Sequence, residues 1–370
     1  MELNENAIYK VAITMFPGVG DANVRRILSI VKDEKLFFEN LNNIEEVQDI
    51  IKKQYTKDEI NLILDKAKRQ LDIAIKNNID ITFYTENKYP RKLANAKDAP
   101  LIIYTKGKAN FDSSRTVAII GTRTTDSEGR ENIYNLVEGL KEKGINVIII
   151  SGLALGADSF AHQAALKYQL PTAGVLGHGF DMLYPAENRH LANEIANGGG
   201  ILITPYYYGH PVSRTTFPRR NKIVAALSDA VIVAQCKIEG GSLITVEYAI
   251  NYHKDIFAYP GRATDKLYTG CNNLIRDNKA TLITNHIDLM NFMKWKPEKK
   301  GFSIQKTLDL TCFTPQEIKI IDYIRQTGIV NIDEISVATQ IPMAELSPIL
   351  LSLEFKDILR SLPGKRYEAK

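Results

Sequence analysis

The chain has few of the residues that stabilise small secreted or metal-bound domains. Its 370 residues include 3 cysteines and 1 tryptophan. The cysteines, Cys236, Cys271 and Cys312, are far apart and odd in number, which fits neither a disulfide framework nor a zinc site. We therefore expect no metal and no other cofactor.

Long apolar runs are also missing. No stretch reaches about 18 uninterrupted apolar residues, the length that suggests a membrane-spanning helix. The first residues, MELNENAIYK, lack the basic and then apolar pattern of a secretory signal. We expect a globular protein of the cytoplasm, with no membrane contact.

A strong excess of charge of one sign is absent as well. The formal net charge is +4, which on a chain of this size does not identify a nucleic-acid binder. The hydrophobic content of 44% over this length is enough for two or three domains. The distribution of the charge is more informative. In TTFPRRNKIVAAL, residues 215–227, three cations and an asparagine directly precede an apolar run typical of a buried helix.

Residues 1–80 are predicted to form a helical domain of the helix-hairpin-helix or SAM-like kind. Within it, Pro17, Gly18, Val19 and Gly20 separate two short segments of helical periodicity. Such glycines permit a tight turn whose free amides can hold a backbone phosphate, with arginines at 25 and 26 nearby. The alternative is that the hairpin only packs within a small helical domain.

Residues 81–290 alternate apolar strands with helical segments. The predicted strands lie at residues 81–84, 101–104, 116–121, 146–152, 172–177, 200–204, 230–235, 255–261 and 280–284. This alternation predicts an α/β fold with a doubly wound, mostly parallel sheet covered on both faces. Ligands of such sheets bind at the carboxyl ends of the strands.

The remaining residues predict a linker at 291–310 and a second small domain at 311–370. The linker contains KWKPEKKGFS, which is polar, basic and interrupted by proline and glycine. Three short helical patterns and a final hairpin then predict a winged helix, a module that binds DNA or protein. Its third helix carries Glu345 and Glu354 and little basic charge, which favours protein contact.

Several predicted strands end in glycine and polar residues. These turns are Gly121-Thr122-Arg123, the segments 151–158 and 177–181, and a stretch around Gly241 and Ser242 that runs into a helix. Glycine there lets backbone amides approach an anion, although tight packing of strand against helix requires glycine as well. Four such turns on one edge of the sheet predict a site for phosphate groups.

The basic segment should reach the same edge, because it lies between the predicted strands at 200–204 and 230–235. It adds Arg214, Arg219, Arg220 and Lys222 to Arg123, which suits a string of phosphates better than one nucleotide. Phe217 and the tyrosines at 206–208 could stack on exposed bases, or could be ordinary packing residues. The histidines at 162 and 190 lie in helical patterns, so no catalytic group is predicted.

The motifs at these strand ends resemble those of the DNA-processing protein A family (DprA, also called Smf). The matching stretches, in order, are YPRKLANAKDAPLIIYTKG, VAIIGTR, SGLALGADSFAHQAAL, GVLGHGFDMLYPAENRHL, FPRRNKIVAALSDAVIV and GGSLITVEYA. They cover roughly residues 80–285. The resemblance implies an extended Rossmann-like domain between an N-terminal helical domain and a C-terminal winged helix.

The resemblance also implies a function without catalysis. Members of the family bind single-stranded DNA without sequence preference, protect it during natural transformation, and load the RecA recombinase onto it as homodimers. The residues that match the family's DNA-binding motifs are Gly121, Thr122, Arg123, Arg214, Phe217, Arg220, Asn221, Lys222, Gly241 and Ser242. Arg219, within the same basic segment, completes the predicted site.

An enzyme is the alternative. Residues 240–247 also resemble the Gly-Gly-x-Gly-Thr-x-x-Glu signature of nucleotide phosphoribohydrolases on a related fold, in which the glutamate takes part in base removal. The glycine before Thr245 is absent here, and that enzyme family lacks the basic segment and the flanking domains. We therefore predict DNA binding rather than hydrolysis.

Overall fold

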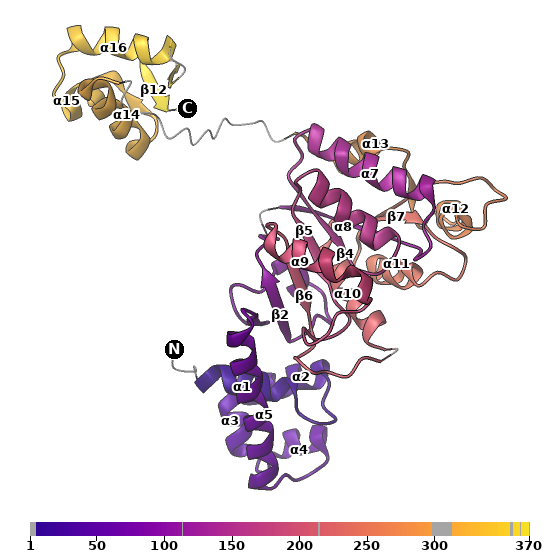
Figure 1. Ribbon diagram of the computed structural model, residues 1–370. Coiled ribbons are helices and arrows are strands. Elements are labelled where there is room, and N and C mark those ends of the chain that lie inside the picture. Colours follow the sequence, from indigo (N-terminus) through magenta and orange to yellow (C-terminus); the bar gives the residue numbers. More distant parts are fainter. Residues whose placement is uncertain are drawn as a thin grey trace. The chain divides into compact units, whose positions relative to one another are not determined.

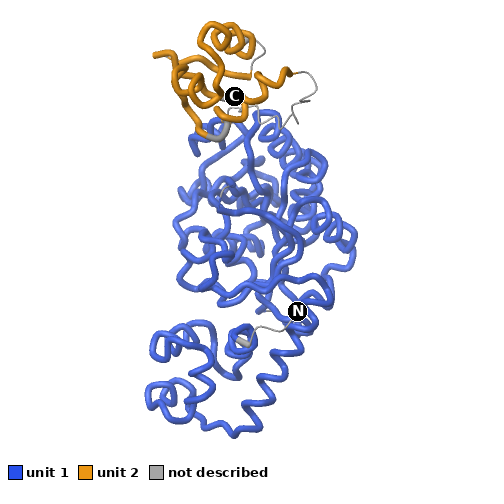
Figure 2. Tube along the Cα trace, turned by 90° about the vertical axis from the view of Figure 1, so that its left-hand side faces the viewer, with its two compact units in different colours: residues 1–296 blue, residues 297–370 orange. Residues whose placement is uncertain are grey.

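The computed structural model describes residues 5–112, 114–213, 215–297, 313–355, 358–362 and 364–369. The chain forms two compact units, Met1–Lys296 and Pro297–Lys370, which Figure 2 distinguishes by colour. In the described parts of the chain, no helix combines the length and the apolar character that crossing a membrane requires. The domain boundaries drawn from the sequence stay predictions.

The N-terminal segment is helical, as its periodicity predicts. Its helices are α1 (Glu5–Thr14), α2 (Asp21–Val31), α3 (Glu34–Asn40), α4 (Glu45–Ile51) and α5 (Lys57–Lys76). The long α5 begins at a capping box, in which Thr56 and Glu59 satisfy each other's backbone amides. The helices share one hydrophobic cluster with Phe83 and Tyr104 of the sheet, so helical segment and sheet pack as one body.

A nine-stranded sheet forms the centre of the first unit (Figure 1). Its strands are β1 (Asp80–Phe83), β2 (Ile102–Gly107), β3 (Arg115–Gly121), β4 (Val147–Ser151), β5 (Thr172–Val175), β6 (Ile201–Thr204), β7 (Ala230–Gln235), β8 (Asp255–Ala258) and β9 (Thr281–Leu282). Their order is β1-β2-β6-β5-β4-β3-β7-β8-β9, and the seven strands from β6 to β9 in this order are parallel. The predicted doubly wound, mostly parallel sheet is confirmed.

The edge formed by β1 and β2 departs from the parallel pattern. β1 pairs antiparallel with β2, and β2 pairs antiparallel with β6. The connection between β1 and β2 contains only the four-residue helix α6 (Arg91–Ala94).

Helices cover both faces of the sheet. They are α7 (Ser127–Glu142), α8 (Ala157–Lys167), η1 (Ala186–Asn188), α9 (Arg189–Asn197), α10 (Thr216–Leu227), α11 (Ser242–Asn251), α12 (Thr269–Arg276) and α13 (His286–Phe292). α7 packs against α8 and α13, while α10 packs against α11 and α6. The strands between them are buried on both faces, which explains why they read as continuous apolar runs.

The second unit is described on its own. It contains α14 (Pro315–Thr327), β10 (Val330–Asn331), α15 (Ile332–Thr339), α16 (Met343–Phe355), β11 (Leu359–Leu362) and β12 (Arg366–Ala369). The three strands form a small sheet in the order β10-β12-β11. Three helices and a hairpin make the predicted winged helix, with its own hydrophobic cluster. Most of the predicted linker and Cys312 lie outside the described residues.

Candidate nucleic-acid interface

The loops after β3, β4 and β7 meet beside the first turns of α10 and enclose a pocket of ≈ 700 Å³. In the sheet, β3 lies between β4 and β7, and the order of the strands reverses at this point. Ligands of doubly wound sheets bind in the crevice at such a reversal. The pocket is lined by these predicted residues: Gly121, Thr122, Arg123, Phe217, Arg220, Asn221, Gly241 and Ser242.

The two glycines of this site have different reasons for being glycine. A Cβ on Gly121 would lie 2.7 Å from the Cβ of Ala157 and 2.8 Å from the carbonyl oxygen of Gln235, so close packing excludes a side chain there. A Cβ on Gly241 would meet nothing within 4 Å. Packing therefore explains Gly121, whereas Gly241 leaves open space in front of its backbone, where a ligand can approach closely.

The side chain of Arg220 is buried and hydrogen-bonded within the protein. It is 6% exposed, and its Nη1 donates to the carbonyl oxygens of Gly152 and Val175, the latter at 2.6 Å. Asp158 lies beside the same loop, where its Oδ2 accepts the amide of Gly152 at 3.1 Å. Burial lowers the pKa of Arg220 and raises that of Asp158, although each charge partly offsets the effect on the other. Arg220 thus fixes α10 onto the ends of β4 and β5.

Arg123 is in the opposite situation. Its residue is exposed on the loop after β3, and its side chain makes no hydrogen bond or ion pair with any described residue. Lys237, on the loop after β7, is also exposed and lines the same pocket. The sequence analysis did not select Lys237, although its place directly before a glycine turn at a strand end is a signal that could have found it.

Aromatic residues stand beside the pocket. Phe217 is half-buried, and its ring lies against Gly177 and 5.7 Å from the ring of Tyr184. Tyr184 is 48% exposed, and with Phe217 and Arg123 it lines a small hollow that adjoins the main pocket. The sequence analysis missed Tyr184, which lies in a loop after β5 rather than in the basic segment.

Arg219 and Lys222 do not line this pocket. They lie on the other side of α10, together with Ile223 and Ala226, in a second pocket of ≈ 420 Å³. Helical spacing explains the division, because positions three and four apart share one face of a helix. Of the five cations predicted to gather at one edge, Arg123 and Arg220 line the first pocket, Arg219 and Lys222 line the second, and Arg214 lies outside the described residues.

The remaining candidates serve in packing. Arg25 of the helical hairpin donates to the carbonyl oxygen of Ala99 at 2.9 Å and lies over the ring of Tyr84, so it joins the hairpin to the sheet. Tyr206 is buried. The buried imidazole of His162 hydrogen-bonds Thr172 at 2.7 Å, and burial lowers the pKa of His162 to about 3. His162 is thus a packed helix residue, as expected.

Two further observations bear on chemistry at this site. Glu247, the glutamate that the phosphoribohydrolase alternative requires, is exposed on α11 and is not among the residues that line the pocket. Across the described residues, no group of three or more histidine, cysteine, aspartate or glutamate side chains is placed to hold a metal ion. What the pocket offers is exposed cations, open backbone and aromatic rings.

Comparison with protein families gives two matches. The family described as DNA recombination-mediator protein A matches residues 80–294, and the DprA winged helix domain matches residues 313–365. The DNA processing protein DprA of Streptococcus pneumoniae is 37% identical over 202 residues, which are 55% of this chain and 70% of that protein. The DprA of Bacillus subtilis is 34% identical over 236 residues, 64% of this chain and 78% of that one.

Comparison with solved structures also gives proteins named DprA. The X-ray structure of DprA from Streptococcus pneumoniae superposes with a TM-score of 0.60 at 29% identity, covering 79% of this chain and 98% of that one. A Helicobacter pylori DprA structure, described as giving insight into its single-stranded DNA binding mode, superposes with a TM-score of 0.52 at 30% identity. It covers 58% of this chain and 95% of that one. The resemblance inferred from the sequence motifs is confirmed.

Proposed function

This chain belongs to the DNA recombination-mediator protein A family, the DNA-processing proteins named DprA or Smf, and we propose that it binds single-stranded DNA at the carboxyl edge of its sheet. The observation that carries the proposal is the exposed Arg123, which has no partner in the described parts of the chain and stands at a pocket whose rim holds Phe217 and Tyr184. The likeness to the Helicobacter pylori protein supports it.

The arrangement suits a single strand for physical reasons. Cations attract the phosphates of any sequence, and an aromatic ring stacks on any exposed base, so neither contact selects a sequence. Bases paired in a duplex are not free to reach Phe217 or Tyr184. The protein should therefore prefer single strands to duplexes and show little sequence preference.

The measurement that tests the proposal is fluorescence anisotropy with single-stranded and duplex oligonucleotides over a range of salt. Among the described residues, the cations of the two pockets whose side chains make no hydrogen bond or ion pair are Arg123, Lys237, Lys97 and Arg219. Each phosphate neutralised on a single strand contributes about −0.7 to the slope of log K against log salt, so four contacts imply roughly −3. A slope near zero, or equal affinity for duplex DNA, contradicts the proposal.

The more specific roles are proposed from the membership of the chain in this family. They are protection of incoming DNA and loading of RecA during natural transformation or homologous recombination, carried out by a cytoplasmic homodimer. The winged helix, whose α16 carries Glu345, is proposed to contact protein rather than DNA. Co-purification with RecA, and the mass of the protein in solution, test the partner and the homodimer.

Hydrolysis remains the rival function. If the chain were a phosphoribohydrolase, incubation with nucleoside monophosphates would release free base, and Glu247→Gln would abolish that release. If no free base is released and single strands bind tightly, the function is DNA binding rather than hydrolysis.

A further inference from the structure

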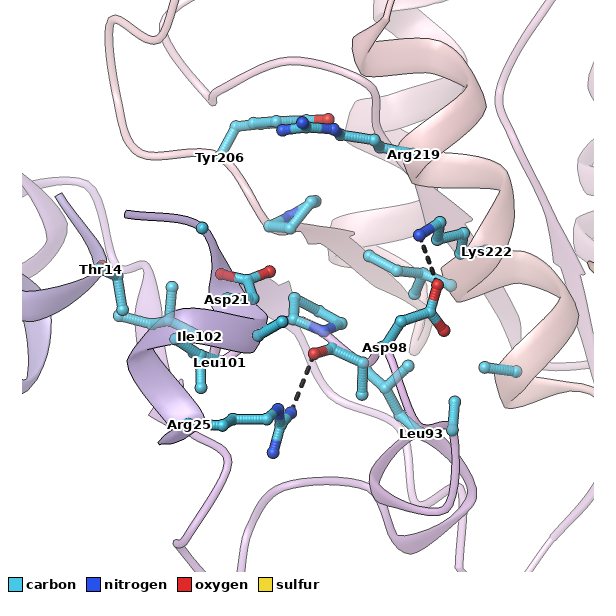
Figure 3. A pocket seen from close by; sticks show the side chains of 18 of the residues that line it. Thr14, Asp21, Arg25, Leu93, Asp98, Leu101, Ile102, Tyr206, Arg219 and Lys222 are labelled. Atoms are coloured by element: carbon cyan, nitrogen blue, oxygen red, sulfur yellow. Dashed lines mark hydrogen bonds and ion pairs between the residues drawn. The ribbon is translucent and has the colours of Figure 1, made fainter. Parts of the chain in front are cut away.

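The second pocket lies where the helical segment meets the sheet domain. It is lined by the start of α2, by the chain leading into β2, by the loop after β6 and by α10. Figure 3 shows its principal charged side chains, which are Asp21, Arg25, Asp98, Arg219 and Lys222. Its volume of ≈ 420 Å³ is within the usual range for pockets that hold small organic molecules.

Three of these five charged side chains have partners within the protein. Lys222 forms an ion pair with Asp98, and Arg25 donates to the carbonyl oxygen of Ala99, as the dashed lines in Figure 3 indicate. Neither Arg219 nor Asp21 makes a side-chain hydrogen bond or ion pair with a described residue. Lys97, which is exposed and also lines the pocket, makes none either, so among the described residues the pocket presents two unpaired cations and one unpaired carboxylate.

The walls of the pocket include rings that are already held in place. The hydroxyl of Tyr206 donates to the carbonyl oxygen of Thr216 at 3.0 Å, and the ring of Tyr206 lies 4.6 Å from that of His210. The hydroxyl of Tyr252 donates to Asp98. Tyr206 is buried whereas Tyr252 is half-buried, so of these two rings Tyr252 is the one that a ligand can contact, at little entropic cost.

The two pockets share α10. Phe217 and Asn221 face the first pocket, and Arg219 faces the second. An α-helix with its side chains is only about 10 to 12 Å across, so a strand that leaves the first pocket over the first turns of α10 reaches Arg219 directly.

We propose that the second pocket holds one nucleotide of the same single strand, with a phosphate on Arg219 and the base placed so that an exocyclic amino group donates to Asp21. This inference rests on the proposed function. The carboxylate sets the orientation, because it repels phosphate and accepts N–H donors.

The orientation implies a modest base preference. Cytosine, adenine and guanine carry an exocyclic amino group, and thymine does not. One hydrogen bond to a charged acceptor corresponds to an affinity change on the order of tenfold, and a solvent-accessible site reduces this to about threefold. We expect oligo-dC to bind about threefold more tightly than oligo-dT of equal length.

The first test compares oligonucleotides of about 4 and about 16 nucleotides. Arg219→Ala should weaken the long one about fivefold and leave the short one unchanged, because only the long strand reaches both pockets. Arg26→Ala is the matched control, since Arg26 is exposed on α2 and lines neither pocket. If Arg219→Ala affects both lengths equally, or neither, the second pocket holds no nucleotide.

Arg123→Ala separates this failure from failure of the proposed function. It should weaken both lengths, because Arg123 lies in the first pocket. If Arg123→Ala weakens binding while Arg219→Ala does not, single-strand binding stands and the second site is overturned. If neither variant changes binding, both proposals fail.

The second test addresses the base. Asp21→Ala should abolish the difference between oligo-dC and oligo-dT, whereas Asp72→Ala, which removes an exposed carboxylate of α5 that lines neither pocket, should preserve it. If Asp21→Ala strengthens binding of both oligonucleotides equally, the carboxylate only repels the strand and the placement of the base is wrong.

Discussion

Arg219 and Arg220 are neighbours in the sequence, but they line different pockets beside α10 and lie in opposite environments. Arg219 is exposed in the second pocket and has no partner among the described residues. Arg220 is buried and donates to the carbonyl oxygens of Gly152 and Val175. One turn of helix therefore carries one charge that is available to a ligand and one that stabilises the fold.

This difference shows how a basic segment should be interpreted. A cation contributes to ligand binding when the folded protein leaves it without a partner, and contributes to the fold when buried carbonyls use its donors. Arg123 resembles Arg219 in this respect, because it too is exposed and has no partner among the residues that the structure describes. Substituting residues of the same type in different environments tests this distinction between ligand binding and fold stability.

The largest expected effect is on stability. Arg220→Ala should lower the free energy of unfolding by about 3 to 5 kcal/mol, because it leaves two carbonyl oxygens without their donor and the half-buried Asp158 without the nearby positive charge. Arg219→Ala should change it by less than about 0.5 kcal/mol. Urea denaturation of both variants measures the difference, and equal effects would contradict the contrast drawn between the two sides of α10.

The two glycines of the site form a second pair. Gly121→Ala should destabilise the protein by about 1 to 3 kcal/mol, because its methyl group would overlap Ala157 and the carbonyl of Gln235. Gly241→Ala should leave the unfolding curve unchanged and weaken DNA binding, because the methyl group occupies the space that the strand approaches. Denaturation and anisotropy on both variants provide the check. Normal DNA binding by Gly241→Ala would remove this glycine from the site.

Substitutions of Phe217 and Tyr184 distinguish packing within the protein from stacking on DNA bases. Phe217→Ala and Tyr184→Ala should each weaken single-strand binding by about 1 to 3 kcal/mol if both rings stack on bases. Only Phe217→Ala should also lower the melting temperature, since the ring of Phe217 is half-buried against Gly177. Melting curves run beside the binding assay separate the two effects. A Tyr184→Ala variant that binds normally would mean that this exposed ring has no DNA partner.

The smallest expected change concerns Arg123. Arg123→Ala should leave stability intact, weaken binding by about 1 kcal/mol and reduce the salt slope by about 0.7, which corresponds to one lost phosphate contact. Arg123→Lys should recover only part of the affinity, because an ammonium cannot make the bidentate contact of a guanidinium. Titrations at two salt concentrations are sufficient. Unchanged binding at both would mean that DNA does not occupy the pocket after β3.

Much of the site could be predicted because it depends on chain order. Glycine turns at the ends of successive parallel strands must meet at one edge, so Gly121 and Gly241 could be placed together without coordinates. Tyr184 and Lys237 were missed because neither belongs to a glycine motif or to the basic segment. Their proximity to Arg123 depends on how the loops after β5 and β7 fold back.

The sequence by itself determined the periodic features, namely the buried parallel strands, the helices between them, the winged helix and the glycine turns, because these depend on local spacing and on chain order. Only the tertiary structure decided which cations remain free. The partners of a cation are distant in sequence: the carbonyl oxygen of Val175 accepts a hydrogen bond from Arg220, and Asp98 forms an ion pair with Lys222. Whether a charge serves the fold or a ligand is set by such partners, and no local pattern contains them.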